Sequence, residues 1–247
     1  EHVSFDVYEG ESLGLVGESG CGKTSLSKAI LGMQEHMSGE VSCHVSRPQM
    51  IFQDPYSSLN PSKTIGWLLM EPLRAAGILD KKCAMSKADR KAAAYDMLAR
   101  VGMDEKYFHR LPSELSGGQR QRISIAQALI TNPGFIIADE PVSALDVTIQ
   151  AQVLALMSEL REKSQTAMLL ITHDLGVVAE ICDKVAILDG GEVAEEGLVS
   201  AVFAAPKSAA GRRLVFPSGA DALVSDPASE RRVRLIFRDS QTTGIPL

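Results

Sequence analysis

The chain has 247 residues, 45% of them hydrophobic and 23% charged, which is ordinary for a globular protein with one large domain or one domain and a smaller appendage. The formal net charge of −6 argues against a nucleic-acid-binding surface, and the Arg212-Arg213 and Arg231-Arg232 pairs are interpreted as solvated surface. No apolar run is long enough to span a bilayer and no signal peptide is visible, so we expect no membrane-crossing segment. The four cysteines are scattered without a C-x-x-C pair, which predicts neither a zinc site nor a disulfide framework and fits a reducing cytosol.

Two strands are predicted at the start of the chain, at 3–7 and 12–16, joined by a turn at Gly10. The alternation at 3–7 is already under way at the first residues, so we expect a fragment whose upstream strand is missing. The second strand leads into a glycine-rich octet that matches G-x-x-x-x-G-K-[ST] and is followed by a helix-compatible run at 25–31. The octet and the residue after it are Gly17, Glu18, Ser19, Gly20, Cys21, Gly22, Lys23, Thr24 and Ser25.

This octet predicts a phosphate-binding loop. Its glycines allow successive backbone N–H groups to turn toward an anion, and the helix that follows adds the positive end of its dipole. Lys23 would reach the β- and γ-phosphates, and the Thr24 hydroxyl would ligate a magnesium ion that bridges them. The alternative is a chance glycine-rich turn before a helix, and GTPases and kinases share such a loop.

The region from the octet to residue 113 changes from strands to helices. Short strands are predicted at 40–45 and 49–52, and Gln53 lies where the second of them becomes a loop. Helical spacing then covers 65–76 and 87–101. The residues expected on one face of the second helix are Ala92, Tyr95, Leu98 and Ala99. We therefore expect an all-helical insertion in a pattern that otherwise alternates strand and helix.

The alternating pattern resumes with Ser116, the predicted N-cap of a helix. The buried face of that helix is expected to carry Ile123, Ala126, Leu129 and Ile130. The further elements are a buried strand at 135–138, a helix at 147–163, a buried strand at 167–171, a helix at 175–182 and a hairpin of 185–188 with 192–194. Alternation of this kind predicts a mostly parallel sheet with helices on its faces.

Four residues, Gly17, Gln53, Asp139 and His173, fall just past the ends of predicted strands. Ligands of such sheets gather at the carboxyl ends of the strands, so we expect these residues to converge on one site. Asp139 is a candidate to orient magnesium opposite the octet, and Glu140 is a candidate to accept a proton from an attacking water. His173 could donate a hydrogen bond to a γ-phosphate oxygen. The alternatives are a solvated acidic turn and a structural histidine.

These motifs together resemble the ATP-binding subunit of an ABC transporter. The six motifs occur in the family's order, over about residues 1 to 205, and the Leu-Ser-Gly-Gly-Gln segment that opens a helix is specific to the family. They are the octet at 17–24, Gln53, 115–119, Asp139-Glu140, 143–146 and His173. The resemblance implies an α/β P-loop NTPase fold with a mostly parallel core sheet, N-terminal antiparallel strands and an all-helical inserted subdomain. The implied division is an ATP-binding core at 1–56 and 114–205, a helical subdomain at 57–113 and a C-terminal tail at 206–247.

The resemblance also implies how the site works. Two subunits would pack head to tail, with ATP between the phosphate loop of one and the signature segment of the other, and Asp146 would lie on the loop between the two sites. The signature residues are Ser116, Gly117, Gly118 and Gln119. Glu140, His173 and Gln53 would be catalytic, while Thr24, Gln53 and Asp139 would hold Mg²⁺. ATP and Mg²⁺ are the implied cofactors, and Gln53 would relay the nucleotide state to membrane partners.

Within the family, the segments at 17–23, 52–61 and 144–150 resemble the importers of oligopeptides, dipeptides and nickel. This branch implies transmembrane permease subunits as partners, an extracytoplasmic solute-binding protein as an indirect partner, no nucleic acid, and a peripheral position on the cytoplasmic face of the membrane. The alternative is a soluble ABC-type ATPase acting in DNA repair or on ribosomes, but the chain shows neither long coiled coils nor a second cassette. The family's adenine-stacking aromatic has no counterpart here, because the chain starts too late.

The tail departs from the resemblance. Its strand-like segment at 232–238 faintly resembles the start of the regulatory domain of methionine importers, cut off soon after its first strand. A lone terminal strand cannot bury a face by itself. A regulatory domain start and a packing tail therefore both stay open.

Overall fold

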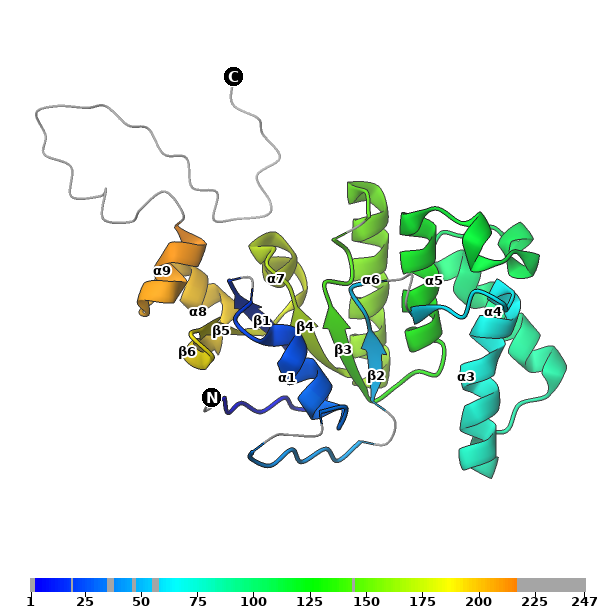
Figure 1. Ribbon diagram of the computed structural model, residues 1–247, viewed down its shortest axis with the longest axis horizontal. Helices are drawn as coiled ribbons and strands as arrows, with labels where there is room; N and C mark the ends of the chain where they lie inside the picture. Colours follow the sequence, from blue (N-terminus) through cyan, green and yellow to red (C-terminus); the bar gives the residue numbers. More distant parts are fainter. Residues whose placement is uncertain are drawn as a thin grey trace, which may run out of the picture.

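The computed structural model describes residues 3–18, 20–34, 38–45, 48–54, 58–143 and 145–216 (Figure 1). The predictions for Ser19, for the Arg231-Arg232 pair and for the strand at 232–238 therefore lie outside the described residues. The elements in chain order are β1 Ser12–Gly17, α1 Lys23–Ile30, β2 Gln49–Ile51, α3 Ile65–Leu79, the 3₁₀ turn η1 Lys81–Cys83, α4 Lys87–Arg100, the 3₁₀ turns η2 Glu105–His109 and η3 Pro112–Glu114, α5 Gly117–Leu129, β3 Phe135–Asp139, α6 Val147–Ser164, β4 Ala167–Ile171, α7 Leu175–Ile181, β5 Lys184–Asp189, β6 Glu192–Leu198, α8 Val199–Ala204 and α9 Ala209–Val215.

One six-stranded sheet runs through the molecule in the order β2-β3-β4-β1-β5-β6. Every pairing is parallel except that of β5 with β6. The mostly parallel core sheet is thus confirmed. Because β1, β3 and β4 are buried along their whole length, they carry near-continuous apolar runs rather than an alternating pattern.

The two faces of the sheet are covered by different helices. Along β3 and β4, Ile136 and Met168 join a core cluster with residues of α5, α6 and α7. Their neighbours Ile137 and Leu169 belong to a second cluster, against which Leu26 of α1 packs. This division follows from the strand period of two, which sends successive side chains to opposite faces.

The helices α3 and α4 lie at one end of the molecule, beyond α5 (Figure 1). Thr64 and Ser86 cap them, since each hydroxyl accepts a hydrogen bond from a backbone N–H of the first turn. On α4 the predicted face is partly wrong. The buried residues of α4 are Ala94, Met97 and Leu98, whereas Ala92 and Ala99 are exposed. The boundaries proposed at residues 57 and 113 stay predictions.

The N-terminal antiparallel strands are a correction. Residues 3–8 and 38–45 contain no strand in the described part of the chain. The alternation predicted at 3–7 is present in the packing, since Val3, Phe5 and Val7 contact the second core cluster. The period-two pattern predicts which side chains are buried, but a strand also needs a partner backbone within hydrogen-bonding distance, and no local pattern supplies that partner.

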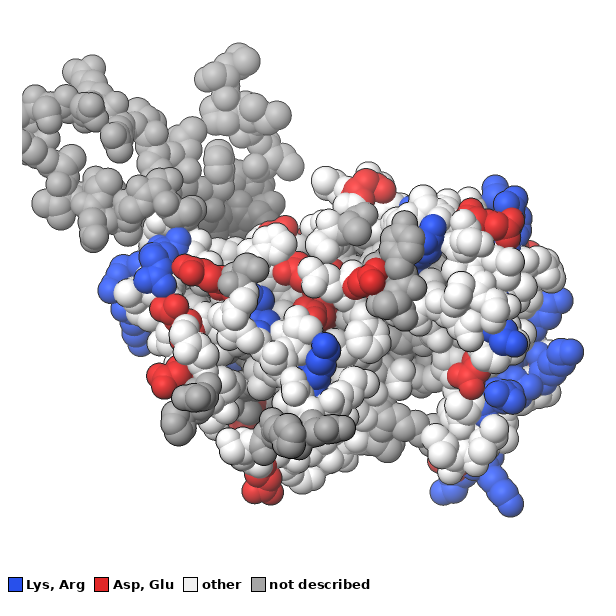
Figure 2. All heavy atoms as spheres, in the orientation of Figure 1, with Lys and Arg blue, Asp and Glu red and all other residues white. Residues whose placement is uncertain are grey.

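The C-terminal described segment forms a hairpin and two helices. β5 and β6 are joined by Gly190 and Gly191, whose φ angles of 58° and 86° suit a tight two-residue hairpin turn. Residues 206–216 pack on the sheet, because Ala210 and Leu214 of α9 join a third core cluster. Among the described residues, no helix is both long and apolar enough to span a membrane. Figure 2 shows Lys and Arg side chains gathered at the two ends of this view, near α3 and α4 and near α8 and α9, with Asp and Glu side chains scattered between them.

Candidate active site

The glycine-rich octet forms a loop between β1 and α1. Gly20 and Gly22 have φ angles of 85° and 100°, in the left-handed region that favours glycine. Gly17 is required by a close approach, because a Cβ atom there would lie 2.6 Å from the backbone oxygen of Leu188. No side chain caps α1 at Gly22, so the first N–H groups of this helix are open toward the loop. The loop therefore presents backbone donors and a helix N-terminus to an anion.

The Lys23 side chain is hydrogen-bonded to the backbone of this loop. Its Nζ donates hydrogen bonds to the backbone oxygens of Gly17 (2.8 Å) and Glu18 (2.9 Å), and it lies 3.6 Å from Cys21 Sγ. The ammonium group is thus held at the mouth of the loop by neutral acceptors. A phosphate oxygen is a stronger partner for it, since charge-assisted hydrogen bonds are roughly twice as strong as neutral ones.

Thr24 and Asp139 meet although 115 positions separate them in the chain. The Thr24 hydroxyl donates to Asp139 Oδ2 at 2.9 Å. Asp139 is only 3% exposed, and this burial raises the pKa of its carboxyl group. The hydrogen bond from Thr24 and the charge of Lys23 lower that pKa, while the charge of Glu140 raises it further. A buried carboxylate that is short of positive charge favours a cation beside it.

Glu140 lies next to Asp139 with its side chain held in a hydrogen-bonded cluster. Its Oε1 is 2.7 Å from Nδ1 of His173 and accepts the backbone N–H of the same residue at 3.2 Å, while Thr172 Oγ1 donates to Oε2 at 3.5 Å. The Glu140 backbone has a φ of 49°, an uncommon left-handed conformation for a residue with a side chain. The Glu140 side chain is nearly buried, whereas that of His173 is 73% exposed. The carboxylate is therefore fixed, and the imidazole faces solvent.

Two further hydroxyl groups contact Glu140, and the sequence analysis assigned neither of them a role. The Thr172 hydroxyl contacts the Glu140 carboxylate, and the Ser143 hydroxyl donates to the Glu140 backbone oxygen at 3.1 Å. Thr172 directly precedes His173, and Ser143 opens the predicted 143–146 motif three residues after Glu140, which are the available signals. Gln53 is exposed and lies two residues after the end of β2. Because Ile51 of β2 pairs with Ala138 of β3, Gln53 lies at the same edge of the sheet as Asp139, the last residue of β3.

The signature segment forms a capped helix start. The Ser116 hydroxyl accepts the Gln119 N–H at 3.3 Å, and Gln119 Oε1 accepts the Ser116 N–H at 2.9 Å, which is a reciprocal capping box. Gln119 Nε2 also donates to the hydroxyl of Tyr107 at 3.0 Å, a contact that sequence reasoning missed. Space around Gly117 is open, since a Cβ there would meet nothing within 4 Å.

The signature segment does not join the phosphate loop of its own chain. In the described ranges no hydrogen bond links 116–119 to 17–24, and Figure 1 shows α1 and α5 apart with β2 and β3 between them. Asp146 is likewise on the surface, where it caps α6 by accepting the Ile149 N–H at 3.1 Å. The structure therefore brings together Thr24, Lys23, Asp139, Glu140 and His173, but leaves the signature residues and Asp146 outside this cluster.

A known family shares this arrangement of motifs. The family described as "ABC transporter" matches residues 1–143. The chain belongs to the ABC transporter family. Its core fold is accordingly that of the P-loop NTPases, as expected, and the chain is an ATP-binding cassette of this family.

Curated relatives of this cassette include two ATP-binding proteins of import systems. The glutathione import ATP-binding protein GsiA of Pectobacterium atrosepticum is 41% identical over 254 residues, covering 97% of the chain and 39% of GsiA. The oligopeptide transport ATP-binding protein OppF of Bacillus subtilis is 44% identical over 211 residues, covering 79% of the chain and 68% of OppF. The cassette thus spans about two fifths of the length of GsiA. This similarity confirms the predicted resemblance to the ATP-binding proteins of importers.

Solved structures of cassettes share the fold. The dimeric, post-hydrolysis ATP-binding cassette MJ0796 bound to ADP and Pi has a TM-score of 0.71 and 29% identity, and the match covers 80% of this chain and 89% of MJ0796. A structure of the ATP-binding subunit of an ABC transporter has the same TM-score at 27% identity, covering 86% of this chain and 89% of that one. The parallel sheet and the phosphate loop described above are therefore those of an ABC cassette.

Proposed function

We propose that this cassette hydrolyses ATP in a head-to-tail dimer and thereby powers import of a peptide or a related small solute through separate membrane permease subunits. The observation that carries the proposal is the cluster at the carboxyl ends of β1, β3 and β4. There Lys23, Thr24, Asp139, Glu140 and His173 surround the mouth of the phosphate loop. A cationic side chain, two candidate metal ligands and a candidate general base thus surround one anion-binding loop.

The phosphate loop would hold the nucleotide. Backbone N–H groups of 17–24 and the N-terminus of α1 would bind the β-phosphate, and Ser25 in the first turn of α1 would add a hydroxyl. Lys23 would exchange its bonds to the Gly17 and Glu18 carbonyls for bonds to the β- and γ-phosphates. This exchange keeps the ammonium group hydrogen-bonded in both states.

Thr24 and Asp139 would hold Mg²⁺, with Gln53 at the same sheet edge. Their contacting oxygens lie 2.9 Å apart, and oxygen is the donor that Mg²⁺ prefers. The described part of the chain has no group of three His, Cys, Asp or Glu residues able to hold a metal, so the ion would share phosphate oxygens and waters. When bound, it neutralises charge that develops on the transferred phosphoryl group. The buried Asp139 carboxylate fits this ion, because the cation offsets the cost of its burial.

Glu140 would act as the general base or align the attacking water. Its carboxylate is next in sequence to the proposed metal ligand and is held in place by His173 and Thr172. The exposed edge of the His173 imidazole would donate a hydrogen bond to a γ-phosphate oxygen. The contact between the two side chains would then fix the base and the phosphate donor relative to one another.

The second half of the site would come from another cassette. Ser116 and the N–H groups of Gly117 and Gly118 form an open helix N-terminus, which suits an anion and does not meet its own phosphate loop. A head-to-tail pair would bring this N-terminus to the γ-phosphate of the partner subunit and would place the exposed Asp146 between the two sites. The dimeric cassettes among the structural relatives support such a pair, either of two copies or of two related chains.

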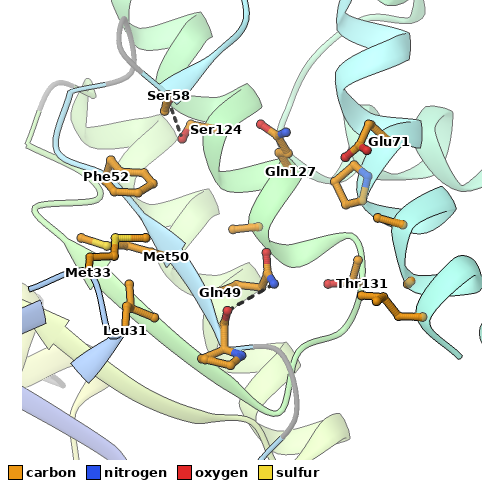
Figure 3. A pocket seen from close by; sticks show the side chains of 16 residues that line it. Leu31, Met33, Gln49, Met50, Phe52, Ser58, Glu71, Ser124, Gln127 and Thr131 are labelled. Atoms are coloured by element: carbon orange, nitrogen blue, oxygen red, sulfur yellow. Dashed lines mark hydrogen bonds between the residues drawn. The ribbon is translucent and has the colours of Figure 1, made fainter. Parts of the chain in front are cut away.

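A groove beside Gln53 would receive the permease. A cavity of about 450 Å³ lies between the end of α1, β2, α3 and α5 (Figure 3). Met33, Met50 and Phe52 lie on one side of it, while Glu71 and Thr131 lie on the other. Because Phe52 directly precedes Gln53, a change at the γ-phosphate would move the wall of this groove. The permease would hold the cassette at the cytoplasmic face of the membrane, and a solute-binding protein would act on the opposite side.

The catalytic proposal is tested with Glu140→Gln. The variant should still bind ATP, lose hydrolysis by about a hundredfold or more, and accumulate an ATP-held dimer, because the amide keeps the shape of the carboxylate but cannot accept the proton. Phosphate release and size-exclusion chromatography measure both effects. Glu159→Gln is the matched control, since Glu159 is a surface carboxylate of α6 paired with Arg100 and Lys163. Hydrolysis by Glu140→Gln at the parental rate would contradict the assignment.

The transport proposal is tested by co-purification. Integral membrane subunits should be recovered with the cassette from detergent-solubilised membranes, and Phe52→Asp in the groove wall should reduce that recovery without abolishing ATP binding. Recovery of ribosomal or DNA-repair proteins in place of membrane subunits would support the soluble alternative. The names of the relatives, which refer to glutathione import and oligopeptide transport, support peptides as the class of solute.

A further inference from the structure

The C-terminal helix α9 reaches the phosphate loop through one side chain. Arg213 Nε lies 3.6 Å from Glu18 Oε1, and its NH2 group donates to Asp189 Oδ2 at 3.1 Å. Glu18 follows the last residue of β1 and Asp189 is the last residue of β5, and the two strands pair at Gly17 and Leu188. Two carboxylates thus lie side by side at the edge of the anion site, with one guanidinium between them. Arg213 had been interpreted from the sequence as solvated surface.

The position of Arg213 is fixed by how α9 docks. The Glu195 carboxylate of β6 accepts the backbone N–H groups of Lys207 and Ser208 at 2.8 Å and 2.7 Å. Partial burial of Glu195 opposes the ionised form, yet these two bonds hold its pKa below the ordinary value. Gly211 permits the close approach, because a Cβ there would lie 2.6 Å from Glu195 Oε2. Ala210 is buried in the third core cluster, which sets the face of α9 that packs on the sheet and leaves Arg213 on the side of the phosphate loop.

The charges matter because a triphosphate is polyanionic. The Glu18 backbone oxygen accepts a hydrogen bond from Lys23, so the Glu18 side chain projects from the loop that would hold the β-phosphate. With Arg213 present, the three side chains carry a net charge of −1, and without it they carry −2. Each additional negative charge at the edge of the loop makes the electrostatic potential there more negative, and this opposes binding of the negatively charged nucleotide.

We infer that Arg213 is a positioning residue for the nucleotide site, which balances Glu18 and Asp189 and keeps their carboxylates from repelling the triphosphate. This inference rests on the proposed function, since it requires that the loop binds ATP. It assigns a role in ATP binding to a helix outside residues 1–143, where the family match lies.

The test uses the whole chain and a fluorescent ATP analogue, mant-ATP, with Mg²⁺ at low ionic strength. Arg213→Gln should weaken binding about threefold to fivefold, which is the upper range for an exposed charge pair. Glu18→Gln alone should tighten binding by a similar factor, and the double variant, with its net charge of −1 restored, should bind like the parent. Arg213→Lys should retain most of the affinity. These differences should shrink at high salt, because exposed charges are screened.

Arg74→Gln is the matched control. Arg74 also pairs with a glutamate, the half-buried Glu71 at 3.5 Å, and the Arg74 side chain is 57% exposed compared with 54% for Arg213. It should leave mant-ATP binding unchanged. A double variant as weak as Arg213→Gln, or a Glu18→Gln variant that does not tighten binding, would overturn the inference, and the latter result needs no substitution in α9. If the parent itself does not bind mant-ATP, the proposed function fails instead.

Discussion

Asp139→Asn should stabilise the nucleotide-free chain while removing its response to Mg²⁺-ATP. Burial raises the pKa of the Asp139 carboxyl group above its ordinary value of 3.8, with the Glu140 charge adding to the rise. The folded chain therefore binds this proton more tightly than the unfolded chain does. It follows that the free energy of unfolding falls as the pH rises from below 3.8 through the pKa of the folded state. Above that range, an ionised Asp139 without a cation destabilises the fold.

The amide of asparagine removes this cost but keeps the contact. Its side-chain oxygen can accept the Thr24 hydroxyl, which now lies 2.9 Å from Asp139 Oδ2. We expect a gain of about 1 kcal/mol in the free energy of unfolding at neutral pH, the usual size when a strained functional group is replaced. The gain should disappear below pH 3.8, where the carboxyl group of the parent is protonated in both states. Since a neutral amide is a poor partner for a divalent cation, added Mg²⁺-ATP should stabilise the parent much more than the variant.

Urea unfolding at neutral and acidic pH, with and without Mg²⁺-ATP, measures these effects. Asp104→Asn is the control of opposite sign, because the Lys106 backbone N–H and then the Lys106 side chain lower the pKa of exposed Asp104. The control should show no gain at neutral pH. A variant at Asp139 that is less stable than the parent at neutral pH would refute the account of the buried carboxylate. Equal stabilisation of parent and variant by Mg²⁺-ATP would refute its role at the metal.

Two further predictions concern residues that hold the site in place. Ser12→Ala should lower the free energy of unfolding by about 1–2 kcal/mol, because its buried hydroxyl accepts from Arg161 at 2.7 Å and from the Asp183 N–H at 3.0 Å. Both donors keep a second acceptor, so the loss is that of the hydrogen bonds and not of two unsatisfied groups. Ser27→Ala is the control, because the Ser27 hydroxyl is equally buried but bonds only to a carbonyl of its own helix. It should change the free energy of unfolding by less than about 0.5 kcal/mol. Equal losses for the two variants in urea unfolding would contradict the role given to the Ser12 hydroxyl. Gly17→Ala should lose mant-ATP binding and about 1–3 kcal/mol of stability, because the new methyl group would meet a backbone oxygen 2.6 Å away on β5; unchanged binding would show that the loop can shift.

Local signals in the sequence were sufficient for most of the helices and core strands. The phosphate loop was identified because its chemistry needs glycines, a lysine and a hydroxyl at fixed spacing, and Gly20, Gly22, Lys23 and Thr24 adopt that loop. The start of α5 was predicted from the capping chemistry of Ser116, which acts over three residues. Convergence of strand ends was also predictable, because parallel strands share one carboxyl edge.

The sequence by itself thus determined the family, the order of the core strands and of most helices, and the candidates for the site. The tertiary structure decided what depends on partners far along the chain. It packed residues 3–7 against the core without forming a strand in the described part of the chain, selected Ala94 rather than Ala92 for burial on α4, and placed Thr172 against the base candidate. It also turned Arg213 from a solvated surface residue into a neighbour of Glu18. Backbone pairing, helix rotation and long-range charge contacts are set by the packing of whole elements, whereas caps, turns and phosphate loops are set by a few adjacent residues.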